Sequence, residues 1–110
     1  MEPTEPQFMS AKKLRGLHLT AAQAQLNMNG GVKGQDNYQK TAKSVMAKKL
    51  RESKKDGLHD SIRESGVKNP VRITTNPLNS RTQLEDGHHR VASAMSIDPN
   101  MMIPIKRDEW

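Results

Sequence analysis

Apolar residues in the middle of the chain recur with the period of a helix. Tyr38, Ala42, Val45, Met46 and Leu50 fall at spacings of four, seven, eight and twelve residues. Side chains at these spacings share one face of an α-helix. The pattern therefore predicts a long amphipathic helix that begins at Tyr38, with lysines on its remaining faces.

A helix, a turn and a strand are predicted to follow. Asp56 is a suitable N-cap, and Leu58 and Ile62 lie one helical turn apart. Gly66 suits the left-handed position that often follows the last residue of a helix. Residues 70–75 alternate apolar with polar side chains and are rich in β-branched residues, which predicts a strand.

The C-terminal part continues with two more strands around a helix. Residues 76–80 are turn formers, and residues 81–85 are expected to return as a hairpin partner. The apolar positions of the next predicted helix are Val91, Ala94, Met95 and Ile97. Asp98 and Pro99 end that helix, and residues 101–105 form a final apolar strand.

The N-terminal part is less regular. We expect residues 1–13 to form a flexible tail, residues 14–19 a short strand, and Thr20 to cap a short helix. Residues 27–37 are rich in glycine and asparagine and predict a mobile loop. Strands joined by helices predict one α+β domain over residues 14–110, with helices packed on a small mixed β-sheet.

The composition narrows the class of protein. Of the 110 residues 33% are apolar and 3% aromatic, and the mean hydropathy is −0.87, so we expect one modest core. Since cysteine is absent, disulfides, thiolate zinc sites and cysteine nucleophiles are excluded. The sequence shows no apolar run of membrane-spanning length and no signal peptide, so we expect a cytoplasmic protein with no membrane partner.

The net charge of +6 is concentrated in the N-terminal half. Residues 11–63 contain 12 basic and 4 acidic side chains, whereas residues 64–110 contain 6 of each. A nucleic acid is a natural partner for such a segment, because its phosphates attract Lys and Arg. The residues expected to contact DNA are Lys43, Lys48, Lys49 and Arg51. The alternative is a helix that is merely well solvated.

A candidate anion site lies at the turn from residue 86 to residue 90. A strand that ends in Asp86-Gly87 and turns directly into a helix presents free backbone N–H groups at its positive end. Gly87 allows a phosphate to approach the backbone, and the guanidinium of Arg90 suits phosphate oxygens. His88 and His89 add donors, although adjacent histidines cannot both point the same way, so we expect one of them to pack inward.

The same turn offers groups for chemistry and for a metal. Were the protein an enzyme, Asp86, His88 and His89 would be its catalytic residues. Glu85 or Asp86 would then hold Mg²⁺ that arrives with the phosphates of a nucleotide. An alternative is that Gly87 is simply a tight-turn residue and the histidines pair with surface carboxylates.

Three blocks of the sequence resemble the ParB/sulfiredoxin superfamily in order and spacing. Residues 58–73 resemble its helix, turn and strand with the pattern Ser-Ile, Gly-Val and Pro. Residues 84–94 resemble the glycine-to-arginine element, and residues 101–105 the closing strand with its proline. The resemblance covers about half of the chain.

The resemblance implies a ParB/sulfiredoxin-like fold that binds a nucleoside triphosphate, CTP or ATP, with Mg²⁺. In the family the glycine-to-arginine element surrounds the triphosphate, and an earlier glycine-to-proline turn closes over the nucleotide. The positions that match these two elements are Gly66, Pro70, Gly87, His88, His89 and Arg90.

The sequence also departs from the family. The sulfiredoxin cysteine falls at His88, which rules out sulfiredoxin redox chemistry. Partitioning proteins usually have Glu-Arg-Arg at residues 88–90 and a further Arg at Ala92. No helix-turn-helix or dimerisation domain follows, so we expect a single-domain accessory protein, as in phages or mobile elements, rather than a complete partition protein.

Three functions are therefore open. The first is a ParB-like module that binds a nucleotide and DNA. The second is an enzyme, either a ParB-like DNA nuclease or a phosphotransferase that uses Mg²⁺. The third is an interaction protein without turnover, and homo-oligomerisation is open for all three.

Overall fold

The computed structural model describes residues 7–28, 35–78 and 80–109 of the chain. In chain order the elements are β1 (Gln7–Ser10), α1 (Ala11–Arg15), β2 (His18–Leu19), α2 (Thr20–Met28), α3 (Gln35–Asp56), α4 (Leu58–Ser65), β3 (Val71–Thr75), β4 (Thr82–Asp86), α5 (His88–Ile97) and β5 (Met102–Glu109). Helices and one mixed sheet share a single core, which confirms the predicted α+β class.

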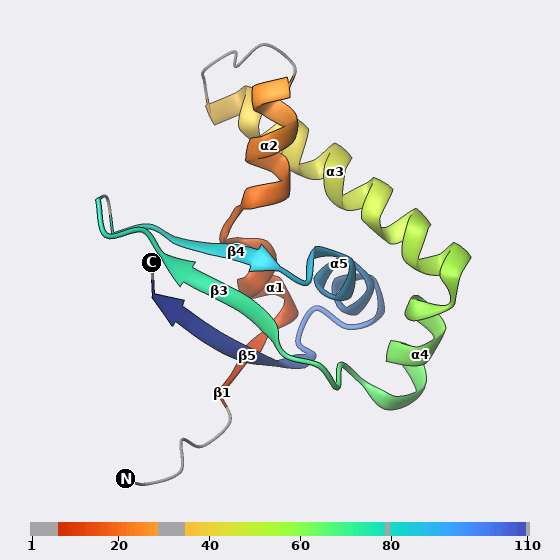
Figure 1. Cartoon of the computed structure of the whole chain (residues 1–110). Coiled ribbons are helices and arrows are strands. Elements are labelled where there is room, and N and C mark those ends of the chain that lie inside the picture. Colours follow the sequence, from red (N-terminus) through yellow and green to blue (C-terminus); the bar gives the residue numbers. More distant parts are fainter. Residues whose placement is uncertain (1–6, 29–34, 79, 110) are drawn as a thin grey trace, which may run out of the picture.

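The sheet has five strands in the order β1-β5-β3-β4-β2 (Figure 1). β3 pairs antiparallel with β4 and parallel with β5, and β1 and β2 form the two edges. Val71 lies opposite Ile105, and Ile73 lies opposite Leu84. These four residues are apolar and buried, so the alternation in residues 70–75 directs one side of the sheet toward the core.

Helix α5 is the centre of the packing. It contacts β3, and α1, α3 and α4 pack around it; α1 and α5 lie on the same side of the sheet (Figure 1). Val91 and Ala94 are fully buried, as the predicted apolar face of this helix requires. Asp98, whose N–H donates to the carbonyl of Ala94 at 2.8 Å, ends α5 where the sequence predicts it.

The first described residues are ordered into secondary structure, unlike the expected tail. Residues 7–13 form β1 and most of α1, and residues 1–6 lie outside the described residues. Met9 pairs with Ile103 in β5 and is buried, and the hydroxyl of Ser10 accepts a hydrogen bond from the N–H of Lys13 at 3.3 Å as the N-cap of α1. Leu14 therefore belongs to a helix.

Three other predicted elements have different boundaries. Of the predicted strand 14–19, only the two residues of β2 are extended in a strand. The last strand, β5, continues beyond residue 105 and pairs with all five residues of β3. Residues 27–28 and 35–37 of the predicted loop are helical, and residues 29–34 lie outside the described residues. Among the described helices none is both long and apolar enough to span a bilayer.

Candidate phosphate-binding site

The turn between β4 and α5 is shaped by Gly87. Its φ of 100° lies in the left-handed region, which L-residues with a Cβ rarely adopt. A Cβ at this position would lie 2.5 Å from Cγ1 of Val71, a fully buried residue of β3. The close approach of two chain segments therefore requires glycine here, which gives the residue a structural role in addition to the predicted one.

The first turn of α5 presents backbone N–H groups without a side-chain cap. Its first intrahelical bond runs from the N–H of Val91 to the carbonyl of Gly87, at 3.0 Å. The N–H groups of His88, His89 and Arg90 precede that bond, and none of the described side chains caps this end of the helix. Together with the helix dipole these groups favour an anion.

These N–H groups border a hollow between α3, α4 and α5. Its volume is about 400 Å³, within the range of small-molecule sites. The lining residues are Lys49, Asp56, Leu58, Asp86, Gly87, His88, His89 and Arg90. The structure thus brings together four of the predicted nucleotide-binding residues, with Asp86 beside them. It adds Asp56, Leu58 and Lys49, none of which the sequence assigned to this site.

Lys49 enters the hollow from α3. The sequence placed it with the DNA-binding residues, but it is half-buried, whereas Lys43, Lys48 and Arg51 are exposed. At 100° per residue, Lys49 lies on the side of α3 that faces α5. The four predicted DNA contacts therefore do not form one surface.

Arg90 joins the hollow to the segment before β3. Its Nη1 donates to the carbonyl oxygens of Asn69 at 2.9 Å and Pro70 at 2.7 Å, and its Nη2 lies 3.8 Å from Oδ2 of Asp86. Within the protein, Nη1 of this guanidinium is thus bonded to two carbonyls, and Nη2 faces a carboxylate. Pro70 is connected to the site through its carbonyl, while Gly66, at φ 72°, ends α4 and does not line the hollow.

His88 is the histidine that packs inward. It is 7% exposed, and its Nε2 accepts a hydrogen bond from the N–H of Ala21 at 3.3 Å, at the start of α2. Burial, assisted by the charge of Lys49, lowers the pKa of His88 to about 4. The ring is therefore neutral with Nε2 unprotonated, which fits neither donation from Nε2 to phosphate nor a general base of useful strength.

His89 takes the opposite orientation. Its side chain is 40% exposed, and its Nε2 lies 3.1 Å from Oε1 of Glu52 on α3. This bond is the main reason that the pKa of Glu52 is lowered. Of the two histidines, His89 is the one that lies at the surface of the hollow, as the geometry of adjacent side chains predicted.

The two carboxylates proposed for Mg²⁺ do not converge. Glu85 accepts hydrogen bonds from Oγ1 of Thr74 at 3.1 Å and Nε2 of Gln83 at 2.7 Å. Asp86 is the next residue of the strand, so its side chain lies on the other face, where Oδ1 accepts from the N–H of Gly87 at 2.9 Å. No group of three or more metal-ligating side chains forms within the described ranges.

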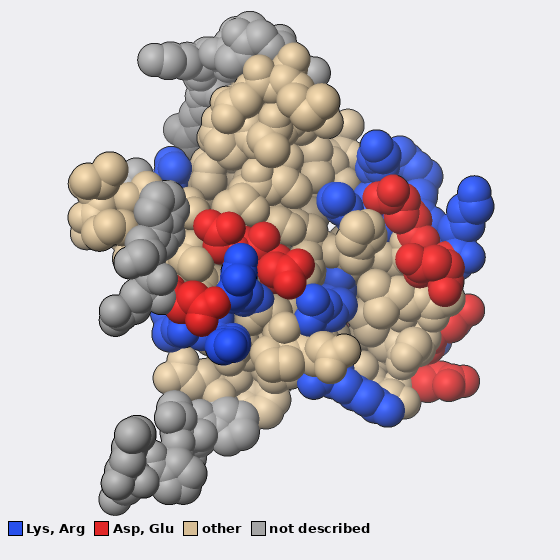
Figure 2. All heavy atoms as spheres, viewed as in Figure 1, with Lys and Arg blue, Asp and Glu red and all other residues tan. Residues whose placement is uncertain are grey.

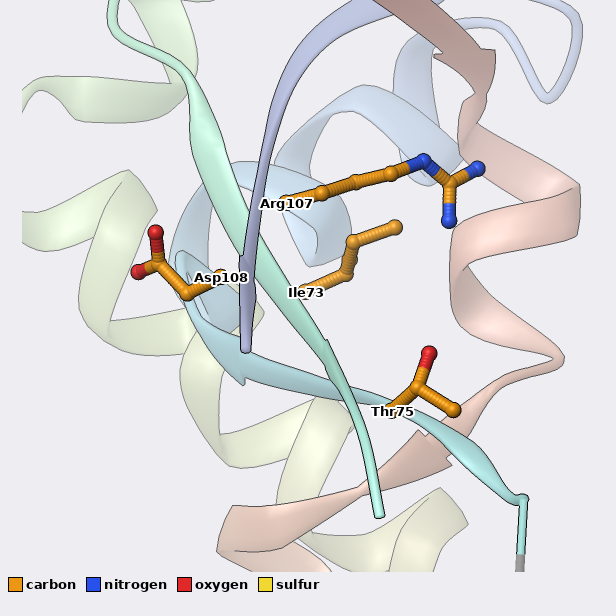
Figure 3. Close-up of a pocket in the computed structure, with 4 residues that line it drawn as sticks. All are labelled: Ile73, Thr75, Arg107 and Asp108. Atoms are coloured by element: carbon orange, nitrogen blue, oxygen red, sulfur yellow. The ribbon is translucent and has the colours of Figure 1, made fainter. Parts of the chain in front are cut away.

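A second hollow lies at the far end of the sheet (Figure 3). It measures about 260 Å³ and is lined by Ile73, Thr75, Arg107 and Asp108. Nε of Arg107 donates to Oε1 of Gln7 at 2.9 Å, and Asp108 lies on the opposite side of β5 (Figure 3), where it pairs with Arg72 at 3.4 Å. Because no helix begins here, the hollow at α5 is the better candidate for an anion.

No protein-family model, curated protein or solved structure gives a significant match to this chain.

Proposed function

We propose that this protein binds the phosphate groups of a nucleoside triphosphate in the hollow at the start of α5. The observation that carries the proposal is the uncapped first turn of α5, which opens onto a hollow lined by Lys49. The resemblance of residues 84–94 to the glycine-to-arginine element of ParB/sulfiredoxin proteins supports the same ligand and a fold of that type, with CTP and ATP as the nucleotides to test.

Each group has a distinct part in this binding. The N–H groups of residues 88–90 donate to phosphate oxygens, and the ammonium of Lys49 neutralises charge from the opposite wall. Through Nη1, Arg90 holds Asn69 and Pro70 against the site, and its Nη2, which lies 3.8 Å from Oδ2 of Asp86, would turn from that carboxylate to the ligand. Leu58 offers an apolar wall for the remainder of the nucleotide.

Magnesium would enter with the phosphates. Asp56 and Asp86 are the carboxylates that line the hollow, and one oxygen of each already accepts a backbone N–H, from Leu58 at 3.1 Å and Gly87 at 2.9 Å. Asp56 keeps a second oxygen, and Oδ2 of Asp86 would exchange its pairing with Arg90 for one contact to a cation that is otherwise held by phosphates and water. Bound Mg²⁺ would offset the charge of the triphosphate.

We propose binding without turnover as the principal activity. Hydrolysis of a phosphate ester needs a group that handles the proton. His88 has its Nε2 occupied by Ala21, and His89 is paired with Glu52. The nuclease and phosphotransferase alternatives are tested by incubating supercoiled plasmid, or ATP and CTP, with the protein and Mg²⁺; nicking or release of phosphate that Asp86→Ala abolishes would establish an enzyme instead.

The binding itself is tested by calorimetry with CTP, ATP and inorganic triphosphate in the presence of Mg²⁺. Loss of a hydrogen bond to a charged group costs about 1.5–3 kcal/mol, so Lys49→Gln should weaken binding about tenfold or more. Lys54→Gln removes the same charge from an exposed position of α3 and should leave the affinity unchanged. No heat with any triphosphate at millimolar concentration, or equal losses in both variants, would refute the proposal.

A further inference from the structure

Helix α3 exposes a continuous basic face on the side away from the core. The six residues of this outer face are Lys40, Lys43, Lys48, Arg51, Lys54 and Lys55, and all are exposed. Their spacings of 3, 8, 11, 14 and 15 residues from Lys40 place them on one side of the helix. The opposite side buries Ala42, Met46 and Ser53.

None of the six side chains takes part in an ion pair within the described part of the chain, although the charge of Lys48 acts on nearby Glu52. Glu52 is the one acidic residue between positions 40 and 55 of the sequence, and it is bonded to His89 on the side toward α5. In Figure 2 Lys and Arg side chains project from α3 at the right of the molecule, with acidic side chains beside them.

A hollow adjoins this face between α2 and α3. It measures about 390 Å³ and is lined by Gln25, Lys40, Thr41, Ser44, Val45 and Lys48. Hydroxyl side chains, such as those of Thr41 and Ser44 here, are among the groups that contact nucleic-acid phosphates beside lysines. The hollow therefore offers hydrogen-bond partners as well as charge at one end of the outer face.

We propose that the outer face of α3 binds the phosphate backbone of double-stranded nucleic acid without reading its sequence. From Lys40 to Lys55 the face extends about 22 Å, at about 1.5 Å per residue. Duplex DNA carries one charge per about 1.7 Å of its axis, so the six cations can reach several phosphates. The surface lies apart from the triphosphate hollow, to which Lys49 belongs.

Two other polyanions fit the surface less well. Binding of single strands without sequence preference relies on aromatic side chains that stack on bases, whereas the six residues of the outer face are all Lys or Arg. A helix that lies on a membrane inserts an apolar face between the lipids. Ala42 and Met46 on the apolar side of α3 are instead buried against the rest of the protein.

The test is fluorescence anisotropy with a labelled DNA duplex of arbitrary sequence over a range of salt concentrations. If all six side chains contact phosphates, log affinity should fall against log salt with a slope near −5, at about −0.9 per phosphate. That slope corresponds to about a thousandfold loss between 50 and 200 mM salt. A duplex of unrelated sequence should bind equally.

A matched pair of variants locates the contact. Lys48→Gln with Arg51→Gln should reduce the slope by about 2 units, whereas Lys13→Gln with Lys106→Gln removes the same charge from α1 and β5 and should leave it unchanged. Exposed Gln is close to Lys in helix propensity, so the fold should persist, which thermal unfolding checks.

Three results would overturn the proposal: equal losses in both variants, tighter binding to single strands than to duplex, and binding to phosphatidylserine vesicles but not to DNA. Triphosphate binding, measured in parallel, should be unaffected by either pair of substitutions, so that failure here is distinguishable from failure of the proposed function.

Discussion

Nη1 of Arg90 lies 2.7 Å from the carbonyl oxygen of Pro70, so the first turn of α5 is tied to the segment that leads into β3. The same nitrogen also donates to the carbonyl of Asn69. Since both carbonyls belong to a segment without regular secondary structure, this guanidinium holds the segment in place. Arg90 is therefore important for the shape of the hollow as well as for its charge.

Arg90→Met should lower the free energy of unfolding by about 1.5–3 kcal/mol, because two carbonyls lose a charged donor. Arg90→Lys keeps the charge but lacks the planar fork, so it should recover only part of the loss. Urea denaturation of the three proteins measures the differences. If Arg90→Lys were as stable as the unsubstituted protein, the positive charge alone would explain the role of Arg90. The two hydrogen bonds to carbonyl oxygens would then contribute nothing measurable to stability.

Gly87→Ala should destabilise the fold although it adds one methyl group. The residue would have to keep a φ of 100° while its Cβ met Val71, which is fully buried and cannot move aside. Strain of this kind costs of the order of 1–3 kcal/mol, and displacement of Val71 adds to it. Thermal unfolding tests this, with Gly57→Ala as control.

The control isolates the steric contribution. Gly57 also has a positive φ, of 89°, but a Cβ there would meet nothing within 4 Å. Gly57→Ala should therefore show the conformational cost alone and be the less damaging of the two substitutions. Equal losses would show that contact with Val71 is unimportant.

Glu85→Gln distinguishes a structural carboxylate from a metal ligand. Oε1 of Glu85 accepts from Thr74 and Gln83, both nearly buried, on the face of β4 opposite to Asp86. The neutral amide should weaken these bonds and cost about 1 kcal/mol in urea denaturation. The affinity for triphosphate in Mg²⁺ should stay the same. A loss of affinity confined to solutions with Mg²⁺ would instead support Glu85 as a ligand.

The sequence predicted best those elements whose pattern is local. The alternation in residues 70–75 and the turn at Gly87 gave β3 and the start of α5 correctly. By contrast β1 exists because Met9 pairs with Ile103, a contact between opposite ends of the chain. A pattern of four residues carries no information about a strand partner so distant in the sequence. Residues 7–10 were therefore predicted to be part of the N-terminal tail.

In the candidate site, too, some groups follow from the local sequence and others are placed by packing between distant segments. The N–H groups after Gly87 follow from a strand that turns directly into a helix, which the sequence displays. Lys49 and Asp56 reach the hollow through the packing of α3 against α5, and His88 turns inward because α2 brings the N–H of Ala21 to its ring. Sequence spacing alone gives none of these three placements.

His88 makes the stability of the protein depend on pH. Its pKa falls from 6.5 to about 4 on folding, so protons bind the unfolded chain more tightly than the folded one. The stabilisation from the neutral ring is therefore complete above pH 6.5 and is lost as the pH falls toward 4. His18 contributes in the same direction, since burial lowers its pKa as well.

Between pH 7.5 and pH 5 the free energy of unfolding should fall by about 2 kcal/mol through His88, at about 1.36 kcal/mol per pKa unit. His88→Gln supplies an uncharged acceptor for the N–H of Ala21 and should be less stable at pH 7.5 but lose less on acidification. Urea denaturation of both proteins at both pH values measures the difference. A dependence on pH as steep in His88→Gln as in the unsubstituted protein would show that His88 is not the group that titrates.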